Sequence, residues 1–219
     1  MSRENTVQNS ALRRRIIDAS RDLFLISGFS RVTMDEIAGA LGISKATLYR
    51  QFSGKEDILA SAMETIKTEI LAGVEGILAD GNTDTLERLA RLTRFMGNWL
   101  SRLGRVLATD MRRNAPGVWE DVERFRREKL LKNFSSILES GIREDVFDAR
   151  MDRDLVLRMY LSLVQNFLNP DLLLNSPYSA SDIIETLFKV FFLGILTDGA
   201  REALADRKIS FYHSNKEVL

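Results

Sequence analysis

The segment from residue 44 to residue 55 gathers side chains that suit contact with a nucleic acid. Three basic side chains, Lys45, Arg50 and Lys55, recur in it at five-residue steps. Hydroxyl, amide and small side chains lie around them: Ser44, Ala46, Thr47, Tyr49 and Gln51. Lys, Arg and hydroxyl side chains donate hydrogen bonds to phosphate oxygens, and the same side chains contact the edges of DNA bases in the major groove. The spacing therefore predicts a local nucleic-acid contact surface.

Individual roles follow from the chemistry of each side chain. Lys45 is the strongest candidate for contact with a base acceptor, such as guanine O6 or N7, or with a phosphate. Ala46 is small enough to meet a thymine methyl group, and Thr47 can donate to either kind of target. Tyr49 lies one helical turn beyond Lys45 on the same face, where half-buried packing is the alternative role. For Arg50, a solvated side chain competes with a contact to backbone or base.

The composition excludes most other kinds of site. The chain of 219 residues has no Cys and a single His, His213, which rules out thiolate metal sites, catalytic thiols and His-rich metal sites. It lacks zinc-protease, phosphate-loop and nucleophile-elbow motifs, so we expect neither an enzyme nor a cofactor. Lys and Arg number 31 and balance 31 Asp and Glu. This balance excludes a globally basic nucleic-acid binder but not local basic runs such as residues 13–15, for which a solvated helix face is the alternative.

Helix caps define the elements that must carry the contact surface. Thr33 and Glu36 fit a capping box that opens a helix, and the N-terminus of that helix makes Thr33 a further candidate for phosphate binding. Gly42 supplies a tight turn, and Ser44 caps a second helix over residues 45–51. Two short helices joined in this way predict a helix-turn-helix, with a helical hairpin that binds nothing as the alternative.

Helical periodicity extends over the rest of the chain. Ser53 and Glu56 fit a second capping box, at the start of a helix over residues 55–79. Further helices are predicted over residues 10–27, 83–100, 103–114, 118–143, 152–168 and 180–199. Alternating strands of useful length are absent from the pattern, so the predicted fold is all-α. A more polar tail is expected from about Ala200.

The chain is predicted to divide into a helix-turn-helix domain over residues 1–54 and a larger helical bundle over residues 55–219. The longest strongly apolar stretch, residues 187–196, is interrupted by Lys189 and is shorter than the roughly 20 residues that a spanning helix needs. The N-terminal residues are polar and basic, without the apolar core of a secretory signal. We therefore expect a cytoplasmic protein with no membrane partner.

The residues from Thr33 to Leu59 resemble the DNA-binding region of the TetR/AcrR family of bacterial transcriptional repressors, and the match extends over residues 12–60. The resemblance implies an all-helical homodimer that binds a palindromic operator in double-stranded DNA. It assigns a phosphate contact to Tyr49 and places the helix N-termini at Thr33 and Lys55 against the DNA backbone. Gln51 stands where many members have His, and its amide can still donate to phosphate.

The resemblance also places the dimer interface on the last two long helices, here residues 152–168 and 180–199. The second of these helices is apolar nearly all round, so it must be buried on more than one side. The candidate interface residues are Ile184, Phe188, Phe191 and Ile195. A core helix within a single chain is the alternative.

A small-molecule site is expected inside the C-terminal bundle, because the resemblance implies a ligand-binding domain there. Large apolar side chains and one amide are its candidate lining: Phe95, Met96, Trp99, Met111, Trp119, Phe125, Tyr160 and Gln165. Ordinary core packing is the alternative for each. The expected function is a homodimeric repressor that an effector releases from DNA, and the alternative is a helical ligand-binding or adaptor dimer without operator binding.

Overall fold

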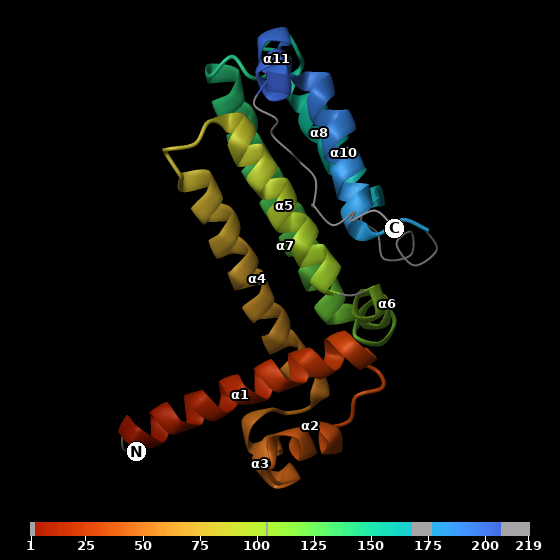
Figure 1. Cartoon of the computed structure of the whole chain (residues 1–219). Coiled ribbons are helices and arrows are strands. Elements are labelled where there is room, and N and C mark those ends of the chain that lie inside the picture. Colours follow the sequence, from red (N-terminus) through yellow and green to blue (C-terminus); the bar gives the residue numbers. More distant parts are fainter. Residues whose placement is uncertain (1–2, 104, 168–176, 207–219) are drawn as a thin grey trace, which may run out of the picture. The chain divides into compact units, whose positions relative to one another are not determined.

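The computed structural model describes residues 3–103, 105–167 and 177–206 as helices joined by short connections (Figure 1). The helices are α1 (Arg3–Ser27), α2 (Met34–Leu41), α3 (Lys45–Gln51), α4 (Lys55–Ala79), α5 (Thr85–Leu103), α6 (Arg105–Asn114), α7 (Pro116–Arg143), α8 (Arg153–Phe167), α10 (Ala180–Ile195) and α11 (Asp198–Asp206). In these residues β-type pairing is confined to one antiparallel bridge, between Phe147 and Leu196. The all-α prediction is confirmed.

The chain forms two compact units. The first comprises Met1–Glu69 with Leu103–Arg124, and the second comprises Ile70–Arg102 with Phe125–Leu219. The predicted boundary between residues 54 and 55 differs from this division, because α1 packs against α6 as well as α2. The assignment of DNA binding and ligand binding to residues 1–54 and 55–219 stays a prediction.

Helix α1 begins earlier than the predicted residue 10. Residues 3–9 contain neither Gly nor Pro, so nothing in them ends the helix, and their polar composition leaves no apolar periodicity to reveal it. Farther along, Ile16, Ser20 and Phe24 are fully buried and form the inner face. Gly28 follows the helix with a φ of 84°, the left-handed conformation that suits a residue after a helix C-terminus.

The helix-turn-helix has the caps that the sequence predicts. The Thr33 side chain accepts the Glu36 N–H at 3.2 Å, and the Glu36 carboxylate accepts the Thr33 N–H at 2.7 Å. Gly42 has a φ of 65° and forms the tight turn. The Ser44 hydroxyl accepts the Thr47 N–H at 3.1 Å and so caps α3.

The capping box predicted for Ser53 and Glu56 at the start of α4 is wrong, because Gly54 directly precedes the helix and the Ser53 hydroxyl donates instead of accepting. The Ser53 N–H and hydroxyl both donate to Asp57, at 2.9 and 3.1 Å, and Gly54 supplies the first carbonyl of the helix, to Ile58. Because the helix begins at Lys55, Asp57 is its third residue and occupies the position that the sequence pattern gave to Glu56.

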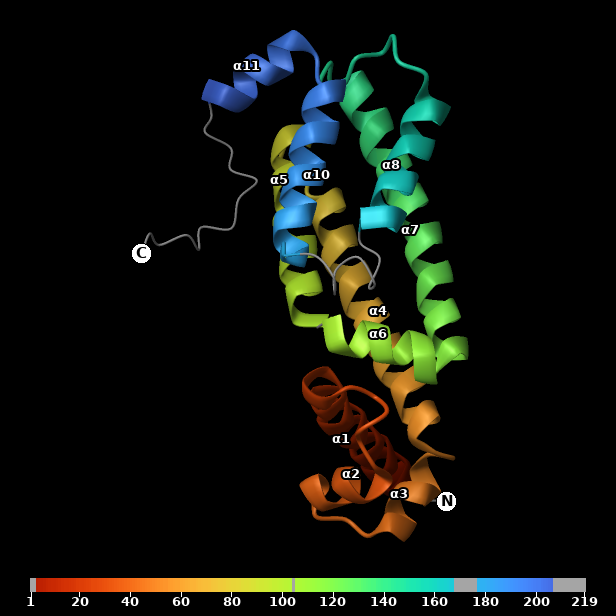
Figure 2. The same ribbon diagram turned by 90° about the vertical axis from the view of Figure 1, so that its right-hand side faces the viewer.

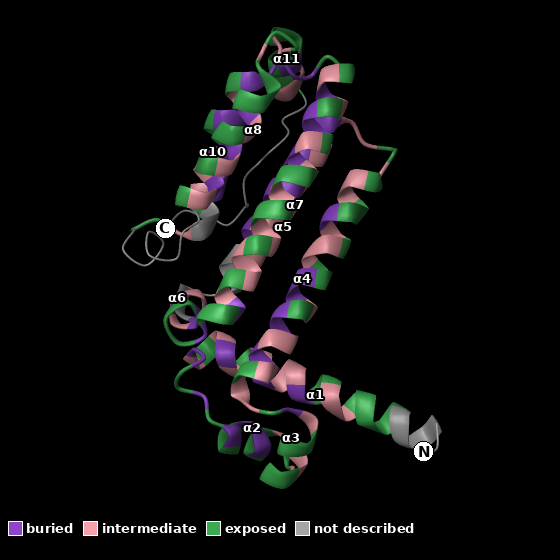
Figure 3. Ribbon diagram, turned by 180° about the vertical axis from the view of Figure 1, so that it is seen from behind, coloured by how far each residue is buried: buried purple, intermediate pink, exposed green. Residues whose placement is uncertain are grey.

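The second unit is built around a cluster of aromatic rings from α7, α8 and α10. The ring centroid of Phe134 lies 4.1 Å from that of Tyr160 and 5.6 Å from that of Phe192. Ile184 and Phe188 belong to the same core, with exposed fractions of 3% and 9%. Buried residues alternate with exposed ones along α10 (Figure 3), so one side of this largely apolar helix faces the core of its own chain.

Two glycines of the second unit lie directly against aromatic rings. A Cβ atom on Gly73 of α4 would fall 2.2 Å from the Phe95 ring of α5, and a Cβ on Gly141 of α7 would fall 2.2 Å from the Phe147 ring. Both distances are far below van der Waals contact. Phe95, a predicted ligand contact, therefore packs α5 against α4.

The C-terminal helix predicted over residues 180–199 is interrupted. Helix α10 ends at Ile195, and Leu196 turns extended and pairs with Phe147. The Thr197 hydroxyl accepts the Ala200 N–H at 3.2 Å, so Thr197 caps α11 where the polar tail was expected. His213 and the remainder of that tail lie outside the described residues. None of the described helices is long and apolar enough to cross a membrane.

Candidate nucleic-acid interface

Helix α3 presents most of its side chains to solvent. Leu48 is fully buried and fixes the helix to the core of the first unit, whereas Ser44, Lys45, Ala46 and Tyr49 are exposed. Figure 2 shows α3 beside α2, with α1 against both. A major groove about 12 Å wide admits an α-helix. A seven-residue helix held by one buried face and open on the other has the form of a recognition helix.

Lys45 is paired with an acid on the preceding helix. Its ammonium nitrogen lies 2.9 Å from a carboxylate oxygen of Asp35, and both side chains are exposed. The hydrogen bond and the negative charge of Asp35 raise the pKa of Lys45. Asp35 is not evident as a partner from the sequence, because the pattern of α2 indicates only caps and packing positions.

A short hydrogen-bond chain runs along the surface of α3. The Thr47 hydroxyl lies 2.9 Å from the Ser44 hydroxyl and accepts a guanidinium N–H of Arg50 at 2.9 Å. Arg50 is therefore drawn back along the helix toward its N-terminus. The chain brings three of the predicted contact residues into one polar row.

Tyr49 and Gln51 have different surroundings. Tyr49 is 49% exposed, so part of the residue is accessible to a phosphate, and the choice between that contact and half-buried packing stays a prediction. The Gln51 amide donates to Asn9 of α1, and the Gln51 carbonyl accepts from Arg13. Gln51 thus links the end of α3 to α1.

The Arg13 side chain contacts neighbouring residues of the first unit. Its guanidinium carbon lies 3.9 Å from the centroid of the Phe52 ring, and it donates to Ser61 at 3.3 Å. Arg14 and Arg15 are exposed. The candidate phosphate contacts of the basic run at residues 13–15 are therefore reduced to its last two residues.

Lys55 turns toward the segment that joins α1 to α2, residues 28–33, which we term the α1–α2 turn. Its ammonium group donates to the Ser30 carbonyl at 3.2 Å and lies 4.4 Å from the centroid of the Phe29 ring. The predicted backbone contact of Lys55 competes with these intramolecular partners.

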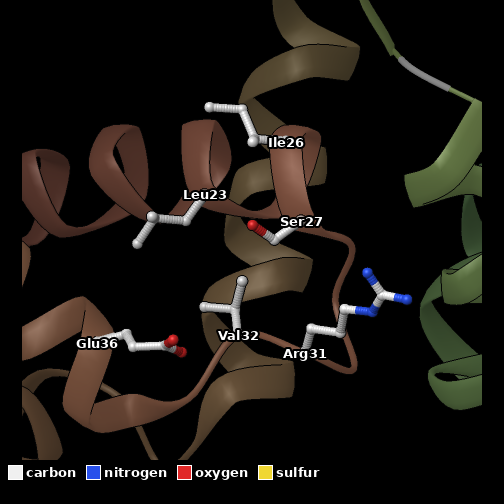
Figure 4. Close-up of a pocket in the computed structure, with 6 residues that line it drawn as sticks. All are labelled: Leu23, Ile26, Ser27, Arg31, Val32 and Glu36. Carbon is white, nitrogen blue, oxygen red and sulfur yellow. The ribbon is translucent and has the colours of Figure 1, made fainter.

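A small pocket of about 310 Å³ lies where α1 ends and α2 begins (Figure 4). Its lining residues are Leu23, Ile26, Ser27, Arg31, Val32 and Glu36. The carboxylate of Glu36 is occupied by the α2 cap, because the backbone N–H and hydroxyl of Thr33 donate to it and lower its pKa. The pocket therefore adjoins the cap and leaves Arg31 as its cationic group.

The predicted ligand-binding residues are divided between the two units. Met111 is 1% exposed and, with Trp119, belongs to the first unit. The others belong to the second unit: Phe95, Met96, Trp99, Phe125, Tyr160 and Gln165. Tyr160 is buried among rings, and burial raises the pKa of its hydroxyl. The ligand-binding role of the set stays a prediction.

An apolar groove lies between α8 and α10. It has a volume of about 1080 Å³ and includes three strongly exposed apolar side chains: Leu155 at 55%, Met159 at 50% and Val190 at 71%. Of the predicted interface residues, Phe191 and Ile195 line this groove, whereas Ile184 and Phe188 do not. The exposed groove thus includes two of the four predicted interface residues.

The fold and the α2–α3 geometry define a DNA-binding helix-turn-helix protein. Residues 16–62 match the family described as "Bacterial regulatory proteins, tetR family". Residues 16–62 are therefore a TetR-type DNA-binding domain, and the chain as a whole is similar to transcriptional regulators of that family.

Individual relatives resemble the chain over different lengths. An uncharacterized HTH-type transcriptional regulator, YvaF of Bacillus subtilis, is 23% identical over 87% of this chain and 98% of its own. The HTH-type transcriptional regulator SrpR of Pseudomonas putida is 33% identical, over 29% of this chain and 30% of its own. A solved transcriptional regulator from Cytophaga hutchinsonii shares the fold with a TM-score of 0.66 and 22% identity, over 83% of this chain and 97% of its own.

Proposed function

We propose that the protein is a homodimeric repressor that binds a palindromic operator and is released by a small-molecule effector. The observation that carries the proposal is the open face of α3, which presents Lys45, Ala46 and Tyr49 next to a capped helix N-terminus. Phosphate contacts from Tyr49 and the helix ends would set register and affinity, while residues 45–47 would set base preference.

The groove between α8 and α10 supports dimerisation. Leu155, Met159 and Val190 give it an apolar, solvent-facing lining, and a second copy of the chain would remove these side chains from water. A two-fold dimer presents two recognition helices and so requires a site with two inverted half-sites, about one helical turn apart or a multiple of it. We therefore place the interface on these residues rather than on Ile184 and Phe188.

The second unit supports effector binding through Tyr160. The ring is 7% exposed, and in the described part of the chain no residue exchanges a hydrogen bond with its hydroxyl. Burial of the side chain raises the pKa of the hydroxyl, so the group keeps its proton and could donate to a ligand that carries one polar group on an apolar body. Such a ligand would weaken operator affinity by its coupling free energy, typically about 1–3 kcal/mol.

Selection from a random DNA library tests the proposal. We expect the full-length protein to enrich an inverted repeat, and a promoter that carries this repeat to lose expression when the protein is present. Enrichment of no sequence would favour the adaptor dimer without operator binding. A rise in reporter expression would identify an activator instead of a repressor.

A further inference from the structure

Both polar backbone groups of Ser30, in the α1–α2 turn, are held by side chains from other helices. Its N–H donates to the Asp110 carboxylate of α6 at 2.6 Å. Its carbonyl accepts from the Lys55 ammonium of α4 at 3.2 Å. The two peptide groups of Ser30 are thus bound by Lys55 of α4 and Asp110 of α6, which follow it by 25 and 80 residues in the sequence.

The two side chains also support one another. Burial alone would raise the pKa of Asp110, but hydrogen bonds from Ser30 and Asn114 and the charge of Lys55 outweigh it and lower the pKa. The Lys55 ammonium packs on the Phe29 ring as well, and Phe29 is 5% exposed. Lys55 therefore has an anionic, a carbonyl and an aromatic neighbour within its own chain.

The position of Ser30 gives these contacts a consequence for the helix-turn-helix. Ser30 precedes Thr33, the N-cap of α2, by three residues, and Gly28 begins the turn in a left-handed conformation. Fixing the Ser30 peptide fixes the path of the chain into α2. Since α2 and α3 are joined through the Gly42 turn, the path into α2 sets the placement of the recognition helix.

We propose that Asp110 and Lys55 are positioning residues that clamp the Ser30 peptide and hold the helix-turn-helix in its DNA-binding arrangement, and that Lys55 serves this clamp rather than a DNA phosphate. The inference rests on the proposed operator binding and adds to it a determinant outside residues 1–54. It also gives α6 a route by which a displacement of that helix changes DNA affinity.

The direction of the change in DNA affinity distinguishes a positioning role from a general electrostatic effect. Removing the negative charge of Asp110 should strengthen DNA binding if the side chain acts only through the overall field. Removing it should weaken binding if the side chain positions the turn. For Lys55, loss of a phosphate contact would flatten the dependence of log K on log salt by about one unit, whereas loss of a clamp leaves the slope unchanged.

The experiment measures binding of the full chain to its selected operator by fluorescence anisotropy, between about 50 and 200 mM salt. The variants are Asp110→Ala and Lys55→Ala, with Glu120→Ala and Lys132→Ala as exposed controls that remove the same charges. We expect each clamp variant to lose about fivefold in affinity or more, as for typical couplings between sites, with the slope of the unmodified protein. The controls should bind the operator like the unmodified chain.

Asp110→Asn covers the case in which the alanine variant fails to fold. The amide oxygen can still accept the Ser30 N–H, so this variant should bind more tightly than Asp110→Ala and less tightly than the unmodified protein. Unchanged or tighter binding by both Asp110 variants overturns the inference, as does a slope flattened by about one unit in Lys55→Ala. Failure of the unmodified chain to bind any selected operator would instead count against the proposed function.

Discussion

The ammonium nitrogen of Lys45 lies 2.9 Å from a carboxylate oxygen of Asp35, so the first base of the recognition helix is paired with an acid on the helix before it. The pair is exposed, and exposed pairs contribute little to stability. The pair should instead affect DNA binding. Asp35 directs Lys45 toward α2, and the negative charge of Asp35 repels DNA phosphates unless Lys45 neutralises it.

Asp35→Asn should therefore raise affinity for DNA of unrelated sequence and relax base preference at the symmetric pair of positions that Lys45 contacts. The released ammonium group becomes free to contact any nearby phosphate. Binding-site selection and titration with an unrelated duplex measure the two effects. Glu120→Gln removes an exposed acid on α7 and should change neither. Unaltered preference in Asp35→Asn would show that Asp35 does not direct Lys45.

Substitutions of Lys45 and Tyr49 should affect DNA binding differently, one through base preference and the other through affinity alone. Lys45→Ala removes a base contact and should cost about 1–3 kcal/mol on the operator, with relaxed preference at one symmetric pair of positions. Tyr49→Phe removes only a hydroxyl and should cost about 0.5–1.5 kcal/mol without changing preference. Selection with both variants separates the roles, and a sequence shift in Tyr49→Phe alone would reverse them.

The dimer interface is best tested at side chains that a single chain leaves exposed. Val190→Asp and Met159→Asp should give folded monomers, because both residues face solvent in the groove and the charge opposes burial against a second copy. Analytical ultracentrifugation measures the mass, and circular dichroism confirms folding. Val7→Asp, at a similarly exposed position on α1, is the control and should remain dimeric. Dimers of both groove variants would place the interface elsewhere.

Glu144 should make stability depend on pH. It accepts the Thr85 N–H at 3.0 Å and an Arg88 N–H at 2.6 Å. Burial alone would raise its pKa, but the hydrogen bonds from Thr85 and Arg88 outweigh burial and lower the pKa below the ordinary 4.5. Because the folded pKa is the lower one, the stabilisation is present above pH 4.5 and is lost as the pH falls through the folded value.

Glu144→Gln should accordingly lower the free energy of unfolding at neutral pH by about 1 kcal/mol, or about 2–4 °C in Tm. The difference from the unmodified protein should shrink as the pH is lowered to about 3, which calorimetry at several pH values can follow. Glu128→Gln, at an exposed position of α7, is the control. A difference that is independent of pH would contradict the ionic role of Glu144.

Tyr160→Phe should not lower the free energy of unfolding, because no hydrogen bond joins the Tyr160 hydroxyl to another residue in the described part of the chain. Denaturant unfolding measures the change as a shift in midpoint at constant slope. Phe134→Ala, in contact with the same ring, should instead cost about 3–5 kcal/mol. Destabilisation by Tyr160→Phe would mean that the hydroxyl is hydrogen-bonded in the protein without effector.

The sequence predicted the helix-turn-helix well because its determinants are local. The Thr33 and Ser44 caps and the Gly42 turn act over three or four residues, and the structure has each of them in place. The contacts that modify the site are not local. Asp35 and Lys45 are 10 residues apart, and Ser30 and Asp110 are 80 residues apart, so no periodic pattern links them.

The interface residues predicted on α10 stay a prediction, and only two of the four, Phe191 and Ile195, line the exposed groove, for a related reason. A helix that is apolar nearly all round carries no amphipathic signal, and periodicity cannot say which side faces its own chain. The structure resolves this choice because Ile184 and Phe188 meet the core, while Val190 remains 71% exposed.

The contact between Gly141 and Phe147 constrains how this sequence can diverge. With the ring only 2.2 Å from where a Cβ would lie, any other L-residue at position 141 would force the buried Phe147 ring to shift. A smaller side chain at position 147 would lift that restriction and leave a void for a larger residue at position 141 to fill. Homologues should therefore vary these two positions together, with glycine at the first wherever the second is aromatic.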